Sequence, residues 1–454
     1  MRSKYLALVL TIVVNLPVTK ASSEVLLIDQ NNWKLQVSGF VEADIIADST
    51  RSFREIIGNS PVATSNSANG ANARTQTSIR NSRLSFVVTP PSLNGWKNKA
   101  VMEFDLLGYN PNISATANNS EASLYNNPTF RVRHSYLKSE NDGFELLFGQ
   151  TWELFGWQSY YFMPSVSIAP LPGLAFARTA QLRTTKNWTF DGGTLSSAIA
   201  ILRPPQSDAA TPDLQAGLRW AACCRSSGYM MGGASARKLE PMSAALSATL
   251  RQINVPSNNG AVTDTTNYNG SALAANIFIP ILSSSEKNLS NTLSLVASYT
   301  QGSGYGDQFS GFTGGAASNL LANTANLNGR TTAQPSLDGG IGDYDANNNF
   351  NLIQITTYNV NLQYHLPNDM PDWVSLGFGV LTSDNMNNLV TSTGKTSGGS
   401  NPYDQERVYY ANYFHEFSPQ TRLGAEYDYV DTRYGNGGVI AKDTRVQVSG
   451  YFIF

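Results

Sequence analysis

Hydrophobic and polar residues alternate in the segment from Trp33 to Asp48. Leucine, valine, alanine and isoleucine occupy most odd positions from Leu35 to Ile45, whereas polar and charged residues dominate the even positions. A period of two places successive side chains on opposite faces of a β-strand. The segment is also longer than the roughly 10 residues with which a tilted strand crosses a bilayer. It therefore predicts a membrane-spanning strand with one apolar and one polar face.

The same alternation returns along the rest of the chain and predicts about seventeen strands. Single-chain bacterial barrels have an even number of strands, so one of these is expected to be false, and the segment 221–240 fits the pattern least well. The predicted fold class is all-β, a transmembrane antiparallel β-barrel of about 16 strands. The expected strands lie near 33–48, 83–88, 99–106, 130–137, 144–152, 176–186, 193–203, 213–224, 227–238, 243–253, 271–282, 290–301, 350–365, 372–383, 405–416, 421–433 and 443–454.

The predicted connections alternate between short turns and long loops, which is typical of membrane barrels. The segment 302–348 is rich in glycine, asparagine and alanine, but strands resume after it, so we expect a loop within one barrel domain. About sixteen strands would leave a water-filled interior. Long loops are expected near 50–75, 108–128, 253–270, 302–348 and 384–404.

The segment after Trp152 is unlike the other predicted loops. Residues 153–173 contain the runs ELFGW, YYFMP and IAPLPG, which are aromatic, broken by proline and too apolar for a free external loop. We expect this segment to fold inward and to constrict the interior of the barrel. The alternative is an external loop that buries its aromatic residues at a subunit contact.

The first residues of the chain have the features of a secretory signal peptide. Arg2 and Lys4 precede an apolar run that ends near Leu16, and the small residues Thr19 and Ala21 stand before a plausible cleavage point. The apolar run is too short to span a bilayer as a helix. We therefore predict a signal peptide at residues 1–21 and a barrel domain at residues 22–454.

The charge composition argues against a nucleic-acid-binding protein. Removal of residues 1–21 takes away three basic residues and no acidic one, so the formal net charge changes from −2 to about −5. Nucleic-acid binding would require a basic excess.

The two cysteines, Cys223 and Cys224, are adjacent, and a bond between neighbours on a strand would be strained because they point to opposite faces. We interpret them as small strand residues without a redox or metal role.

Several motifs give the chain a family resemblance. The C-terminal strand, with Val446, Val448, Phe452 and the final Phe454 on one parity, is similar to the C-terminal signal of outer-membrane barrels. The runs SIRNSRLSF, FRVRHSYL and FGQTW, which begin at residues 78, 130 and 148, resemble those of the DcaP-like trimeric outer-membrane porins. So does the sequence Pro172-Gly173 followed by Arg178, Gln181 and Arg183. The resemblance covers about residues 33–186 and the C-terminal strand.

The resemblance implies a sixteen-stranded barrel in the outer membrane of a Gram-negative bacterium, a homotrimer, and passive diffusion of small hydrophilic solutes such as dicarboxylate anions. We expect no long N-terminal helical extension of the kind that some of these porins carry. No cofactor and no catalytic chemistry are predicted, so the chain is not expected to be an enzyme.

Charged residues on the polar face of the predicted strands would steer solutes through the pore. An arginine that faced lipid at mid-depth would cost about 2–4 kcal/mol, so most of these arginines should face water or protein. Guanidinium groups bind carboxylates and phosphates, which suits an anion pore. Glu42, Asp44 and other acids on the same faces could pair with the arginines and remove this preference. The candidate pore-lining residues are Arg80, Arg83, Arg131, Arg133, Arg178, Arg183, Glu103, Asp105 and Glu153.

Two other functions are compatible with a barrel. An enzyme would need a histidine-centred base, but none of the three histidines lies in a nucleophile motif, and His134 falls on the apolar parity, as an interface residue would. A surface adhesin could use the long loops. No cluster of ligands predicts a metal site, and Asp343 and Asp345 are interpreted as solvated loop residues.

Overall fold

The computed structural model describes eleven stretches of the chain. The predicted signal peptide and most of the loops expected at 108–128, 302–348 and 384–404 lie outside the described residues. The described residues are 24–58, 60–108, 129–206, 209–256, 265–284, 288–309, 340–344, 349–367, 372–386, 403–435 and 438–454.

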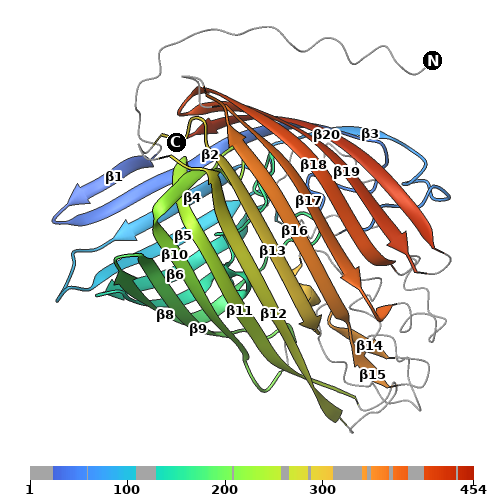
Figure 1. Ribbon diagram of the computed structural model, residues 1–454, viewed down its shortest axis with the longest axis horizontal. Helices are drawn as coiled ribbons and strands as arrows, with labels where there is room; N and C mark the ends of the chain where they lie inside the picture. Colours follow the sequence, from blue (N-terminus) through green and yellow to red (C-terminus); the bar gives the residue numbers. More distant parts are fainter. Residues whose placement is uncertain are drawn as a thin grey trace.

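The strands form a closed antiparallel barrel with sixteen positions around the ring (Figure 1). Strands that are adjacent in the ring follow one another in chain order, and the ring closes between β2 and β20. Two short strands, β3 and β4, both pair with β2 and share one position. The barrel strands are β2 (Trp33–Asp48), β3 (Arg74–Ser78), β4 (Arg83–Thr89), β5 (Lys97–Asp105), β6 (Arg131–Asn141), β7 (Phe144–Trp152), β8 (Arg178–Phe190), β9 (Gly193–Leu202), β10 (Asp213–Tyr229), β11 (Lys238–Pro256), β12 (Thr265–Leu282), β13 (Leu293–Ser303), β16 (Gln354–His365), β17 (Trp373–Ser383), β18 (Tyr403–Ser418), β19 (Thr421–Tyr434) and β20 (Val439–Ile453).

Smaller elements lie beside the ring. The strand β1 (Glu24–Gln30) forms a hairpin with the first half of β2, and β14 (Gly342–Tyr344) pairs with β15 (Phe350–Leu352). Two short 3-10 helices, η1 (Phe155–Trp157) and η2 (Gly306–Gln308), lie in connections between strands. Among the described residues, no helix is long and apolar enough to cross a membrane.

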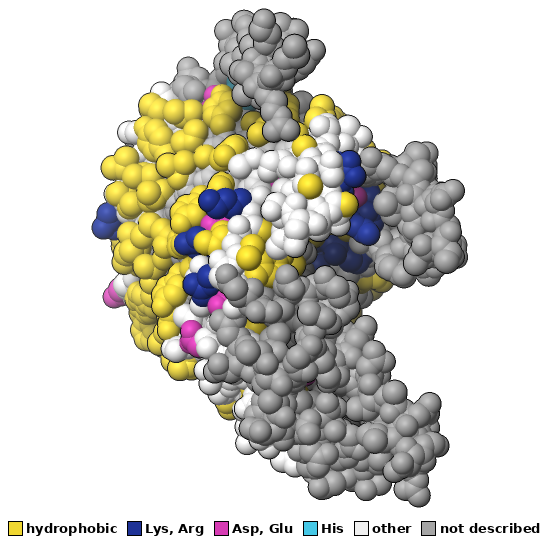
Figure 2. Space-filling view, turned by 90° about the vertical axis from the view of Figure 1, so that its right-hand side faces the viewer, with side chains coloured by type: hydrophobic (Ala, Val, Ile, Leu, Met, Phe, Trp, Pro, Cys, Tyr) yellow, Lys and Arg dark blue, Asp and Glu magenta, His cyan; other side chains and the backbone are white. Residues whose placement is uncertain are grey.

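The two faces of the sheet differ as the alternation predicts. On β11 and β12, Leu246 and Leu273 are more than 60% exposed on the outer face, whereas Thr249 and Ala274 are buried on the inner face. Hydrophobic side chains cover a broad area of the outer surface (Figure 2). This arrangement is what a bilayer requires, because only a closed ring satisfies every backbone hydrogen bond in hydrocarbon.

The predicted count of sixteen strands is confirmed, and the one false candidate lies in the segment expected to be least regular. Residues 227–238 do not form a separate strand: β10 continues to Tyr229, and residues 230–237 connect it to β11. Seventeen predicted strands therefore become sixteen. The two methionines at 230–231 have the character of strand residues, but they are buried or half-buried in a connection.

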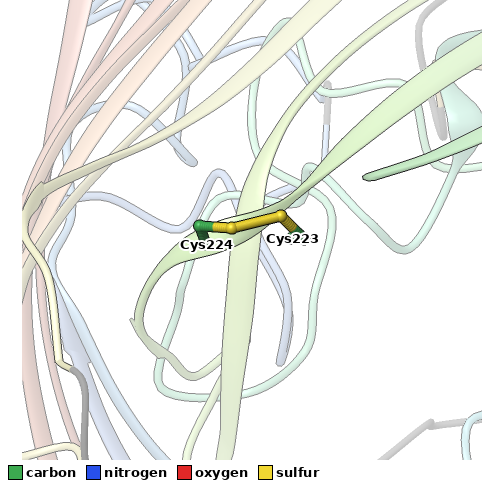
Figure 3. The surroundings of a disulfide bond; sticks show 2 residues. All are labelled: Cys223 and Cys224. Atoms are coloured by element: carbon green, nitrogen blue, oxygen red, sulfur yellow. A yellow bond between two sulfur atoms is a disulfide. The ribbon is translucent and has the colours of Figure 1, made fainter. Parts of the chain in front are cut away.

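The interpretation of the cysteines as small, unpaired strand residues is wrong, because a disulfide joins Cys223 to Cys224 (Figure 3). The prediction assumed a regular strand, in which neighbours point to opposite faces. In β10 the register with β11 is interrupted between Ala221 and Ser226, and pairing with β9 ends at Ala222. The cysteines lie in this irregular stretch, so the alternation of a regular strand does not apply to them.

Candidate functional site

The space enclosed by the barrel, the lumen, is crossed by residues 153–177, here called the constriction segment. At one end the backbone N–H of Gly156 donates to Ser247 Oγ on β11 at 2.7 Å. Further along, the N–H of Val166 donates to Glu426 Oε2 on β19 at 2.9 Å. Because β11 and β19 lie on nearly opposite sides of the ring, the segment must pass through the lumen. The inward fold predicted for this segment is confirmed.

Close packing fixes the far end of the constriction segment on the wall. Gly173 has a positive φ of 80°, and a Cβ atom there would lie 2.4 Å from the carbonyl oxygen of Val380 on β17. Asn359 on β16 donates from Nδ2 to the carbonyl of Gly173 at 2.5 Å. Phe162 and Phe176 stack on each other, with ring centroids 5.0 Å apart. The segment is therefore held by its own aromatic core and by backbone contacts that only glycine permits.

Two of the candidate arginines are neutralised by two of the candidate acids. Arg131 donates from Nε and Nη2 to the two oxygens of Asp105, at 3.0 and 2.6 Å. Arg133 donates to Glu103 Oε1 at 2.7 Å and to Asp105 Oδ2 at 3.0 Å. Such charge-assisted pairs fix the geometry of both side chains. These four residues therefore add little net charge to the lumen.

Arg83 and Arg178 have no carboxylate in salt-bridge contact within the described part of the chain. Arg83 donates from Nη2 to the carbonyl of Ile168 in the constriction segment at 2.9 Å and lies over the ring of Phe40. Arg178 lies over Trp152, with its guanidinium carbon 4.6 Å from the ring centroid. Both arginines thus pack where the constriction segment meets the wall.

Arg80 lies in the break between β3 and β4, which explains why it falls on a different parity from Arg83. Its Nη1 donates to Glu55 Oε1 at 2.8 Å, and its Nη2 donates to the carbonyl of Gly108. The side chain is buried. Through these hydrogen bonds, Arg80 links the loop residues Glu55 and Gly108 to the barrel wall.

His134 faces the lumen, contrary to the sequence-based interpretation. A β-bulge at Arg133 shifts the register between β5 and β6, so that His134 opposes Glu103 while Val132 opposes Phe104. Two residues on one strand then oppose one on the other, and the alternation reverses beyond the bulge. Tyr136 and Lys138 turn inward for the same reason, whereas Leu137 is exposed on the outside. Alternation alone gives no signal of such a bulge.

A pocket of about 260 Å³ lies between the constriction segment and the wall formed by β5 to β10. Four basic side chains line it, of which the sequence analysis selected only Arg183. Lys138 pairs with Glu140 and Glu145. Lys99, Arg183 and Arg219 form no salt bridge with a described residue. The basic lining consists of Lys99, Lys138, Arg183 and Arg219.

Glu153 lies at the edge of this pocket and is fully buried among polar side chains. Gln215 and Gln308 donate to its Oε2 at 2.6 and 2.7 Å. Burial, with a smaller effect from the nearby Asp307, raises the pKa of Glu153 to about 7 from its usual 4.5. The carboxyl is therefore partly protonated near neutral pH and opposes the basic side chains less than a free carboxylate would.

The opposite wall of the lumen carries many acids, but they are covered. Glu42 accepts a hydrogen bond from Ser167 of the constriction segment at 2.8 Å, and Glu426 accepts one from the backbone of Val166. Asp44 and Asp428 on the same wall are also buried. Glu42 and Asp44, two of the acids that alternation placed in the lumen, thus do not line its open part.

Comparison with known proteins agrees with this architecture. The family model described as Gram-negative porin matches residues 18–435. The chain belongs to the Gram-negative porins. No curated protein matches the sequence significantly.

Solved structures support the fold. The outer-membrane channel DcaP of Acinetobacter baumannii has a TM-score of 0.61 at 17% identity, with 94% of this porin and 99% of that chain covered. An anion-selective porin from Comamonas acidovorans has a TM-score of 0.50 at 11% identity, over 93% and 100% of the two chains. OprB of Pseudomonas putida has a TM-score of 0.50 at 10% identity, over 92% and 94%.

Family and fold together place the porin in the outer membrane of a Gram-negative bacterium as a channel and not as an enzyme. The histidines have ordinary structural contacts: His134 with Thr151 at 3.0 Å, and His415 with Asp372 at 2.9 Å. Within the described stretches, no group of three or more His, Cys, Asp or Glu residues is arranged to hold a metal ion.

Proposed function

We propose that this porin allows passive diffusion of small hydrophilic anions, such as dicarboxylates, across the outer membrane. The observation that carries the proposal is the basic lining of the pocket beside the constriction segment. Lys99, Arg183 and Arg219 form no salt bridge with a described residue, and Glu153, the acid nearest to them in the constriction segment, is buried. Positive charge in a narrow, low-dielectric passage attracts anions and repels cations.

The ion pairs distinguish the arginines that support this proposal from those that do not. Arg131 and Arg133 are matched by Asp105 and Glu103, so their charges largely cancel. Among the described residues, the Arg183 side chain donates only to the carbonyl of Trp152, at 3.4 Å. Arg219 lies over Tyr160, with its guanidinium carbon 4.1 Å from the ring centroid, and contacts the hydroxyl of Tyr161. The last two arginines keep a net positive charge that a passing carboxylate can approach.

Replacement of both Arg183 and Arg219 by Ala tests this proposal. In planar bilayers under a KCl gradient, we expect the wild-type porin to favour chloride and the double variant to lose most of that preference. Arg433→Ala is the matched control, because Arg433 pairs with Asp404 away from the pocket and its side chain is 40% exposed. An unchanged reversal potential in the double variant would remove the assigned role of the two arginines.

The assembly and the processing of the chain belong to the same proposal. We infer a homotrimer, as the resemblance to the DcaP-like porins implies, and removal of residues 1–21 as a signal peptide during export. The porin from Comamonas acidovorans, whose fold is similar, is described as anion-selective, and this supports the proposal. Mass measurement of the purified porin in detergent, and N-terminal sequencing, test these two points.

A further inference from the structure

A second segment also enters the lumen. It starts from the end of the barrel opposite the one at which the constriction segment connects β7 to β8. Residues 230–237, here called the inner turn, join β10 to β11 at the end where the other connections are short. Met230 and Gly233 are buried, and a Cβ atom at Gly233 would lie 2.3 Å from the ring of Tyr451 on β20. Since β20 lies far around the ring from β10, the inner turn reaches across the lumen to the other wall.

Two side chains of that wall hold the inner turn by its backbone. Gln363 on β16 accepts from the N–H of Met230 at 2.7 Å and donates to the carbonyl of Met230 at 2.9 Å. Arg422 on β19 donates from Nη1 to the carbonyls of Gly233 and Ser235, at 2.8 and 2.7 Å. Arg422 is itself fixed by Glu416 at 3.0 Å. Hydrogen bonds from a charged, buried donor are among the stronger ones in proteins.

The inner turn also holds the middle of the constriction segment. The N–H of Ser165 donates to the carbonyl of Met231 at 3.3 Å, and the N–H of Gly233 donates to the carbonyl of Val166 at 3.0 Å. Tyr451 donates to the same carbonyl of Val166 at 2.6 Å. The two segments therefore form a short parallel pairing inside the barrel, centred on Ser165 and Gly232.

This pairing lies directly over the acidic wall. Val166 and Ser167 are the residues that donate to Glu426 and Glu42, and both carboxyls are buried. Displacement of the inner turn would remove two of the backbone contacts that keep residues 165–167 in place. Water and ions could then reach carboxylates that are now covered.

We propose that the inner turn is a selectivity-determining element that holds the constriction segment over the acidic wall and leaves only the basic side of the lumen open. The inference rests on the proposed anion-conducting function. It differs from that proposal because it assigns selectivity to a segment that contributes no charge to the basic pocket: no residue of the inner turn lines it.

Two variants test this proposal without changing the basic pocket. The first combines Gln363→Ala with Arg422→Lys, which keeps the positive charge beside Glu416 but shortens the donor that holds the inner turn. The second replaces residues 230–236 by Asn-Gly and keeps Arg237, which pairs with Glu416, so that a short connection suited to a β-hairpin is made without loss of charge. In planar bilayers we expect both to show a larger conductance than the wild type and a reversal potential shifted toward cations. Arg433→Ala on the same strand as Arg422 should change neither quantity.

The outcomes separate the two proposals. A wild-type porin without chloride preference would contradict the proposed function, whereas the shift in the variants would still support the inner turn as a cover of the acids. A wild-type porin that prefers chloride, together with folded variants whose reversal potential is unchanged, would overturn the inference. Folding is checked by the heat-dependent mobility of the barrel in SDS gels. If the double variant does not fold, the hairpin replacement alone tests the inference.

Discussion

At the scale of single residues, the lumen contains side chains whose behaviour depends on burial more than on their charge in the sequence. Glu153 counts as an acid beside a basic pocket, yet burial raises its pKa to about 7. Arg133 counts as a cation, yet it is buried against Glu103 and Asp105. Sequence analysis could select these residues, but it could not assign their partners, because those lie on elements distant in sequence.

The raised pKa of Glu153 makes the stability of the porin depend on pH. The folded state retains the proton up to a higher pH than the unfolded chain does. This contribution to stability is complete below about pH 4.5 and is lost as the pH rises through about 7. Glu153→Gln cannot ionise, so we expect its free energy of unfolding at pH 8 to exceed that of the wild type by on the order of 2 kcal/mol. The variant should therefore unfold at a higher temperature than the wild type at pH 8 but not at pH 5.

Thermal unfolding of the two proteins in detergent at both pH values measures this difference. Glu140→Gln serves as the control, because Glu140 lies near the turn after β6 and about half of its side chain is exposed. If the wild type and Glu153→Gln change in parallel between pH 5 and pH 8, Glu153 does not titrate in this range.

Gly173 offers a second test at this scale. A methyl group there would meet the carbonyl oxygen of Val380, and the positive φ disfavours any other residue. We expect Gly173→Ala to destabilise the porin by about 1–3 kcal/mol and to make its conductance larger or less steady. Gly450→Ala is the control, since nothing lies within 4 Å of its Cβ position. Equal unfolding temperatures for the two variants would show that the segment is not held at Gly173.

At the scale of elements, alternation predicted the features that a two-sided sheet imposes directly. The first predicted strand, Trp33 to Asp48, has the bounds of β2. The inward fold of the constriction segment was also predictable, because a loop with that many aromatic residues needs burial. The bulge at Arg133 was not predictable, since one inserted residue leaves the composition of β6 unchanged while it reverses every later side chain.

The inner turn is a second element that could not be predicted from the sequence. Its residues 230–231 are methionines, which suit either a strand or a buried turn. Only the contacts with Gln363, Arg422 and Tyr451, distant in sequence, distinguish the two. The disulfide between Cys223 and Cys224 lies in the irregular stretch of β10 that precedes this turn, and it was missed because a regular strand was assumed.

At the scale of the whole molecule, the lumen has two unlike sides. The wall of β5 to β10 carries the basic pocket, and the wall around β19, β20 and β2 carries acids that lie under the constriction segment. The formal charge of the chain, −2 overall, therefore does not predict the charge that a passing solute meets. Under the two proposals, the ion selectivity of the pore depends on which side of the lumen the two inward segments cover.

The reversal potential of the purified, folded wild-type porin in a planar bilayer under a KCl gradient tests this two-sided lumen most directly. If the basic side is the open one, the potential favours chloride, and the preference becomes smaller at high salt because screening weakens the steering. A potential that favours potassium, or none at all with clear conductance, would contradict the claim that the basic side of the lumen is the open one.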